Sequence, residues 1–123
     1  MGARQQRGRA AQQRGIDTET AARAALEQDG WTIRARRLRT PAGEIDLVAE
    51  KAGLLAFVEV KARPTLAVAA DALAPRQRAR LLAAAEIVLA KHPEWGAAGV
   101  RFDVIVVDAA GAVRRIADAF RVE

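Results

Sequence analysis

Two acidic residues and a lysine lie in neighbouring apolar stretches of the chain. Asp46 belongs to the stretch 44–50, and Glu59 and Lys61 form a Glu-x-Lys sequence in the stretch 54–62. Carboxylate oxygens are ligands that Mg²⁺ prefers. A bound Mg²⁺ can acidify a water molecule and polarise a phosphodiester, and a nearby amine can stabilise the charge that develops. These three residues are therefore candidates for the centre of a metal-dependent phosphodiesterase.

The turn between the two stretches decides whether these side chains meet. A two-residue turn at residues 52–53 places Asp46 opposite Glu59 and Glu44 opposite Lys61, and a four-residue turn gives the same pairs. A turn of three or five residues would place the two acids on opposite faces of the sheet. With an even turn, the Cβ atoms of Asp46 and Glu59 would stand roughly 5 Å apart.

Apolar residues surround these charges in both stretches. The face predicted for the charged residues also carries Val48, Leu55 and Phe57. The opposite face is predicted to carry Ile45, Leu47, Val58 and Val60. Burying charges in such a setting costs several kcal/mol unless they are paired or bound to a metal. A functional site is one interpretation, and an ordinary solvated polar face is the alternative.

The rest of the pattern predicts an α/β fold in which a mixed central sheet is flanked by helices. A helix is expected from Asp17 or Thr18 to about Asp29, with Gly30 just after its end. A second helix is expected between Pro75 and Pro93. Strands are expected at 31–38, 44–50, 54–62 and 101–108, with a short edge at 113–120. Asp103 is expected to pair with a neighbouring basic residue.

Length and composition indicate one domain, at residues 16–123, preceded by a flexible basic arm at residues 1–15. The chain has 123 residues, no cysteine and a formal net charge of +5. Residues 1–40 hold nine arginines against four acids, which favours a polyanionic partner, although a solubilising tail is the alternative. No apolar run suits a signal peptide or a membrane span, so we expect a soluble cytoplasmic protein.

Several stretches resemble the YraN-like family of small uncharacterised bacterial proteins. They are Glu19-Thr-Ala-Ala, Gly30-Trp31, Arg39-Thr-Pro-Ala-Gly-Glu-Ile-Asp-Leu-Val-Ala, Phe57-Val-Glu-Val-Lys-Ala-Arg63, Arg101-Phe-Asp103 and Ala119-Phe120. The Asp…Glu-x-Lys pattern is also similar to that of the PD-(D/E)XK nuclease superfamily. This resemblance implies a restriction-endonuclease-like αβββαβ core, related to that of the archaeal Holliday-junction resolvases.

The resemblance also implies roles for individual residues. It makes Asp46, Glu59 and Lys61 the nuclease triad. It places Glu19 on the first helix as a further metal-site acid, for which an ordinary first-turn glutamate is the alternative. Three positions depart from the family pattern, because Arg37 stands where Asn is common, Gln77 where Lys is common and Arg115 where His is common.

The function expected from these observations is a metal-dependent endonuclease that acts on structured or branched DNA in repair or recombination, with RNA as an alternative substrate. Mg²⁺ or Mn²⁺ would be bound by Asp46, Glu59 and Glu19. Auxiliary roles are expected for Glu19, Glu44 and Gln77. Nucleic-acid contacts are expected from Arg7, Arg9, Arg14, Arg39, Arg63 and Arg76, and Arg78 and Arg80 could follow the same phosphate backbone or form a solvated helix face.

Two other functions fit the same sequence. One is a nucleic-acid-binding protein with a nuclease-like fold but no turnover, and the other is an interaction subunit that needs a partner. No membrane association is expected. A homodimer would suit an enzyme that must make two cuts in a branched substrate.

Overall fold

The computed structural model describes residues 18–67 and 73–120. The expected arm at residues 1–15 lies outside this part of the chain. A helix covers residues 18–28 and is followed by β1 (Thr32–Thr40), β2 (Gly43–Lys51), β3 (Leu54–Ala62), α2 (Pro75–Lys91), β4 (Gly99–Val107) and β5 (Val113–Phe120). The expected α/β fold is confirmed, and it is consistent with a restriction-endonuclease-like core.

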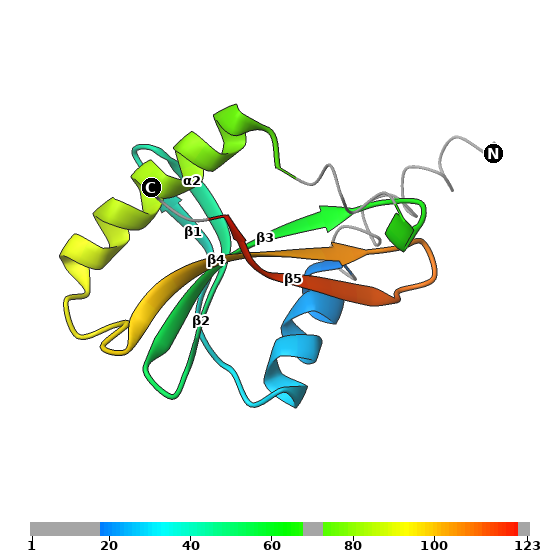
Figure 1. Ribbon diagram of the computed structural model, residues 1–123, viewed down its shortest axis with the longest axis horizontal. Helices are drawn as coiled ribbons and strands as arrows, with labels where there is room; N and C mark the ends of the chain where they lie inside the picture. The colour runs from blue at the N-terminus through cyan, green and yellow to red at the C-terminus, as the bar shows by residue number, and fades with distance from the viewer. Residues whose placement is uncertain (1–17, 68–72, 121–123) are drawn as a thin grey trace, which may run out of the picture.

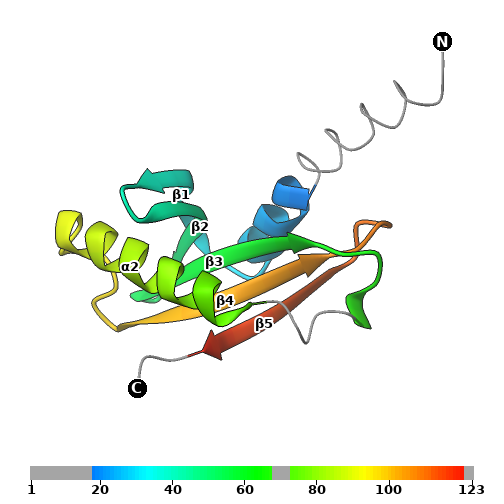
Figure 2. The same cartoon turned by 90° about the horizontal axis from the view of Figure 1, so that it is seen from above.

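The five strands form one mixed sheet in the order β1-β2-β3-β4-β5. β3 and β4 run parallel, and the other neighbouring pairs are antiparallel. The parallel pair requires a crossover, and α2 is part of it. In Figures 1 and 2, α2 lies on one side of the sheet and the helix at residues 18–28, drawn in blue, lies on the other. The sheet is therefore covered on both faces, as its near-continuous apolar strands require.

Each helix has its own part of the core. The N-terminal helix buries Ala22 and Leu26 against Trp31 and one face of the central strands. α2 buries an apolar stripe against the other face, where it meets Phe57 and Phe102. The buried residues of α2 are Leu81, Ala84, Ala85 and Val88.

The predicted helix ends agree with the structure. Gly30 adopts a φ of +87°, which suits the residue that follows a helix. α2 begins at Pro75, and the side chain of Gln77 accepts a hydrogen bond from the Ala74 N–H at 3.3 Å, as in a capping box. No helix among the described residues has the length and apolar character to cross a membrane.

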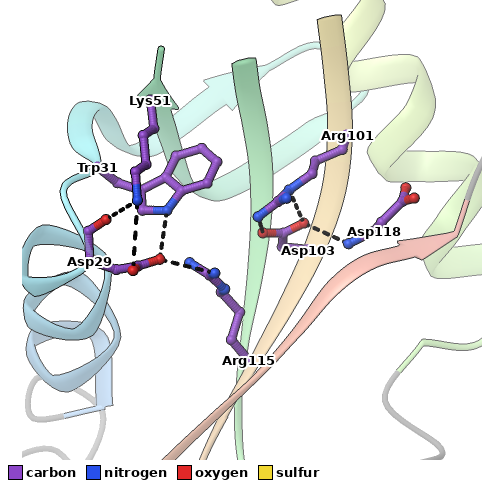
Figure 3. A network of polar contacts seen from close by, with 7 residues as sticks. All are labelled: Asp29, Trp31, Lys51, Arg101, Asp103, Arg115 and Asp118. Atoms are coloured by element: carbon purple, nitrogen blue, oxygen red, sulfur yellow. Dashed lines mark hydrogen bonds and ion pairs between the residues drawn. The ribbon is translucent and has the colours of Figure 1, made fainter. Parts of the chain in front are cut away.

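Polar contacts link β4 to β5 and link β5 to the turn that follows the N-terminal helix, where Arg115 lies 3.1 Å from the Asp29 carboxylate (Figure 3). Asp103 on β4 is fully buried and accepts a hydrogen bond from Arg101 Nη2 at 3.0 Å and one from the Asp118 backbone N–H at 2.9 Å. Arg101 and Arg115 also lie over the ring of Trp31, at 4.8 and 5.6 Å from its centroid. The expected pairing of Asp103 with a neighbouring basic residue is confirmed.

Candidate functional site

The turn between β2 and β3 has the even length that the site requires. Ala52 and Gly53 form a two-residue turn with φ values of +51° and +80°. Two positive φ values are typical of the type I′ turn that best fits the twist of a hairpin. The strands then pair from Lys51 opposite Leu54 to Leu47 opposite Val58, which is the predicted register.

Beyond Leu47 the two strands separate, and this fork is where the site lies. β2 leaves β3 but continues to pair with β1 as far as Gly43. The expectation that Asp46 would face Glu59 as a strand pair, and that Glu44 would face Lys61, was therefore wrong. The Asp46 carboxylate instead accepts a hydrogen bond from the Val60 backbone N–H at 2.8 Å, so this carboxylate bridges the two strands where the ladder ends.

An unusual backbone conformation lies beside the fork in β1. Arg37 adopts a φ of +48°, a value that is sterically unfavourable for a residue with a Cβ atom. Ile45 packs with Val48 in the core beneath α2, whereas Leu47 packs beneath the N-terminal helix. The prediction that Ile45 and Leu47 share a face was wrong, because the strict alternation of side chains fails between these two residues.

Glu59 is the buried centre of a small charged cluster. Its side chain is 9% exposed, and its Oε1 lies 3.5 Å from Lys61 Nζ and 3.7 Å from Arg80 Nη2. Lys61 is also largely buried, with 14% of its side chain exposed, whereas 48% of the Arg80 side chain is exposed. The structure thus brings Asp46, Glu59 and Lys61 together and adds an arginine from α2.

Both carboxyl groups hold their protons more tightly than usual. Burial is the main cause that raises the pKa of Asp46, and the nearby Glu44 charge raises it further. Burial also raises the pKa of Glu59, with repulsion from Asp46 as the next cause. Lys61 and Arg80 act in the opposite direction on both pKa values, but they do not outweigh burial. Two acids that repel in a partly desolvated site are poised to gain from a bound cation.

Glu19 lies at a pocket that it shares with Asp46. The pocket has a volume of about 340 Å³, and its other lining residues are Thr18, Arg37, Glu44, Val60 and Ala62. The Glu19 carboxylate accepts a hydrogen bond from Arg37 Nε at 2.8 Å, so its charge is already balanced. The structure therefore places Glu19 at the site, where its carboxylate is paired with the Arg37 guanidinium.

The other predicted residues lie at various distances from the cluster. Glu44 is close enough to influence Asp46 and lies 3.8 Å from Arg39, whose side chain is 90% exposed. Gln77 is engaged at the start of α2, and its predicted auxiliary role stays a prediction. Arg63 follows β3, and Arg76 is exposed on the first turn of α2. Arg7, Arg9 and Arg14 lie outside the described residues.

The donor set suits a magnesium-type ion bound in part by water and substrate. In the described ranges, no three side chains of Asp, Glu, His or Cys converge as a metal site. Mg²⁺ commonly uses only one or two protein carboxylates and keeps several waters for the rest of its octahedron. Asp46 and Glu59 supply that number of carboxylates, and a bound cation would offset the burial that is the main cause of their raised pKa values, together with the repulsion from neighbouring acids.

Sequence reasoning did not place Arg80 or Arg37 at the site. Arg80 was grouped with Arg76 and Arg78, either as contacts to a phosphate backbone or as a solvated helix face, and was not expected beside Glu59. The spacing to Leu81 and Ala84, which shows which side of α2 is buried, could have indicated that Arg80 borders the sheet. No sequence signal indicates the positive φ of Arg37, because Arg rarely adopts it.

Comparison with known proteins places this arrangement in a family. Residues 18–107 match the uncharacterised protein family UPF0102. A UPF0102 protein of Granulibacter bethesdensis is 66% identical over 117 residues, which are 95% of this chain and 74% of the relative. Relatives from Azorhizobium caulinodans and Acidiphilium cryptum are each 49% identical; they match 95% and 94% of this chain and 89% of their own length. The chain belongs to the UPF0102 family.

Proposed function

We propose that this protein is a metal-dependent nuclease that hydrolyses phosphodiester bonds in structured or branched DNA. The observation that carries the proposal is the meeting of Asp46, Glu59 and Lys61 at the fork between β2 and β3, where two carboxyl groups of raised pKa lie beside cations. The resemblance of this Asp…Glu-x-Lys pattern to PD-(D/E)XK nucleases supports the same conclusion.

The residues have separate tasks in the proposed reaction. Mg²⁺ or Mn²⁺ would acidify a water molecule and polarise the scissile phosphate. Asp46 and Glu59 would hold the ion, with Glu19 available if Arg37 releases it. Lys61, fixed beside Glu59, would orient the attacking water or donate a hydrogen bond to a phosphate oxygen as negative charge grows. Water adds to phosphorus and gives up a proton to the solvent, the bond from phosphorus to the leaving sugar oxygen breaks, and that oxygen takes up a proton from a solvent water.

A cleavage assay tests the proposal. The purified protein is incubated with supercoiled, nicked, flapped and four-way DNA and with RNA, in Mg²⁺, Mn²⁺ or EDTA. We expect cleavage only with a divalent ion. Asp46→Asn and Glu59→Gln should lower the rate by at least about 10³-fold and Lys61→Met by about 10²–10³-fold, the usual cost of losing such groups.

The matched control is Glu86→Gln, which removes one exposed carboxylate from α2 without touching the site. It should cut like the wild-type protein. Activity that survives Asp46→Asn and Glu59→Gln would assign catalysis to another site. Tight binding of nucleic acid without cleavage under any condition would favour the binding protein, and one stoichiometric protein partner without nucleic acid would favour the interaction subunit.

A further inference from the structure

We propose that Arg80 on α2 is a phosphate-binding residue of this site and contacts the nucleic-acid backbone at the fork between β2 and β3. The inference rests on the proposed function for its ligand class, a polyanion, but it does not depend on turnover. Binding measurements can therefore separate the two proposals.

The first support is where Arg80 lies. α2 packs against β1 and β2, so the first turns of this helix border the fork. Arg80 Nη2 lies 3.7 Å from Glu59 Oε1, and the Arg80 charge lowers the pKa values of both Asp46 and Glu59 against the larger effect of burial. A phosphate held beside the two carboxylates would therefore lie within reach of this guanidinium.

The second support is that Gly43, in the hairpin between β1 and β2, leaves room for the aliphatic part of the Arg80 side chain. A Cβ atom at Gly43 would lie 2.8 Å from Arg80 Cδ and 2.9 Å from Arg80 Cγ, closer than real Cβ atoms approach other carbons. Gly43 also has a φ of +138°, which side chains rarely permit. The glycine that opens the Gly-Glu-Ile-Asp sequence thus lets Arg80 cross the hairpin and enter the site.

The third support is that the N–H donors of the Arg80 guanidinium are available to bind another partner. Arg80 carries five N–H donors, and none of them makes a hydrogen bond to any residue that the structure describes. Its contact with Glu59 is longer than a hydrogen bond. The side chain is half exposed, whereas Lys61 is nearly buried. The planar guanidinium fits two phosphate oxygens at once, so Arg80 would meet the substrate from the solvent side.

The alternative is that Arg80 only neutralises Glu59, and salt-dependent binding distinguishes the two roles. The affinity of the full-length protein for a fluorescein-labelled four-way DNA junction is measured by anisotropy in Ca²⁺ between 50 and 300 mM salt. Arg80→Gln keeps most of the stem and removes the charge, and Arg80→Lys keeps the charge. Arg114→Gln, an exposed arginine on β5, is the matched control.

We expect Arg80→Gln to weaken binding about tenfold at the lowest salt and to reduce the slope of log K against log [salt] by about one, as for one lost phosphate contact. Arg80→Lys should restore the slope, and Arg114→Gln should change neither quantity. An unchanged slope in Arg80→Gln, with an unchanged melting temperature, would overturn the inference, as would a failure of the wild-type protein to bind the junction. Binding that responds to Arg80 without any cleavage would overturn the nuclease proposal alone.

Discussion

At the scale of single residues, two opposing effects act on the Glu59 carboxylate: burial destabilises its charged form, and neighbouring cations stabilise it. Glu59 is almost enclosed by its neighbours, yet it carries an ionisable carboxyl, and only Lys61 and Arg80 compensate it among the described residues. Such an arrangement costs stability in the absence of a ligand. Residues that cost stability and keep a specific geometry are typical of functional sites.

This balance predicts how stability depends on pH. Because the pKa of Glu59 is raised above its ordinary value of 4.5, the folded protein binds this proton more tightly than the unfolded chain does. The free energy of unfolding therefore falls as the pH rises from the ordinary carboxyl pKa through the raised one. Glu59→Gln mimics the protonated acid, so it should raise the free energy of unfolding by about 0.5–2 kcal/mol at pH 8.

Urea denaturation at pH 4 and pH 8 measures this effect. The gain from Glu59→Gln should shrink at pH 4, where the wild-type carboxyl is itself largely protonated. Glu86→Gln should change stability by less than about 0.5 kcal/mol at either pH. A Glu59→Gln variant that is less stable than the wild type at pH 8 would contradict the account.

The same raised pKa values should control metal binding. A carboxylate must lose its proton to bind a cation, so protons compete with the ion over a higher pH range than for ordinary acids. Mn²⁺ should stabilise the protein more at pH 8 than at pH 5.5. At pH 8 the gain should reach about 2.7 kcal/mol once the Mn²⁺ concentration exceeds the dissociation constant 100-fold. Differential scanning fluorimetry measures this, and an equal effect in Asp46→Asn would show that the ion binds elsewhere.

Gly43 provides a further test of the contact with Arg80. Gly43→Ala should lower the free energy of unfolding by about 1–3 kcal/mol, because the new Cβ meets the arginine stem at a φ that already disfavours it. Gly111→Ala is the control, since Gly111 has a φ of +85° but no atom lies within 4 Å of the place that its new Cβ would take. Equal losses in both variants would show that the Arg80 contact contributes nothing.

At the scale of elements, the contacts of Asp103 tie β5 to β4, and Arg115 on β5 is paired with Asp29, just after the N-terminal helix (Figure 3). Between Phe102 and Val104 the pairing of β4 with β5 is irregular, and the Asp103 carboxylate accepts the Asp118 N–H there. This buried carboxylate thus replaces ladder hydrogen bonds, just as Asp46 does at the fork. Asp103 belongs to the structure of the sheet, because its carboxylate joins β4 to β5.

Removing Asp103 should therefore be costly. Asp103→Ala leaves the Arg101 guanidinium, whose side chain is only 20% exposed, without its carboxylate partner. We expect a loss of about 3–5 kcal/mol in the free energy of unfolding, as for other broken buried pairs. Urea denaturation measures this, and Asp108→Ala, at a surface turn, should cost less. A loss below about 1 kcal/mol for Asp103→Ala would show that the network is not a major support of the sheet.

The sequence predicted the elements well because their signals are local. Alternating apolar residues, Gly30 and Pro75 mark where strands and helices begin or end, and Ala52-Gly53 fixes the hairpin register. The fork was not predictable, because it lies where Arg37 has a positive φ and where Ile45 packs under a helix distant in the sequence, and no local pattern signals either feature. The order of the strands is also non-local, since nothing within the fourth strand specifies that it lies between β3 and β5.

At the scale of the whole molecule, the candidate site and the excess of basic residues lie in different parts of the chain. The sheet and its helices hold a compact site, while the arginine excess lies in residues 1–40. In both views, the described chain enters the sheet through the helix opposite α2 (Figures 1 and 2). A nucleic acid at the fork would therefore meet Arg80 from α2, and basic residues before the first helix could add sequence-independent affinity.

Truncation of the first 15 residues tests whether the N-terminal arginines contribute to DNA binding. The segment holds four arginines and no acid, so its removal should reduce the salt slope of DNA binding by about two to four. The melting temperature should stay within about 2 °C of the full-length value, because residues between Ala22 and Val107 form the core of the part of the chain that the structure describes. An unchanged slope would show that these arginines do not contact the nucleic acid.

The central claim is that Asp46 and Glu59 hold a divalent ion at the fork of β2 and β3. Crystals soaked in MnCl₂, with diffraction recorded at the manganese absorption edge, test it directly. The account predicts an anomalous peak about 2.1–2.3 Å from oxygens of both carboxylates, and no such peak in Asp46→Asn crystals. A soaked wild-type crystal with no peak between these two residues, or with manganese bound only elsewhere, would contradict it.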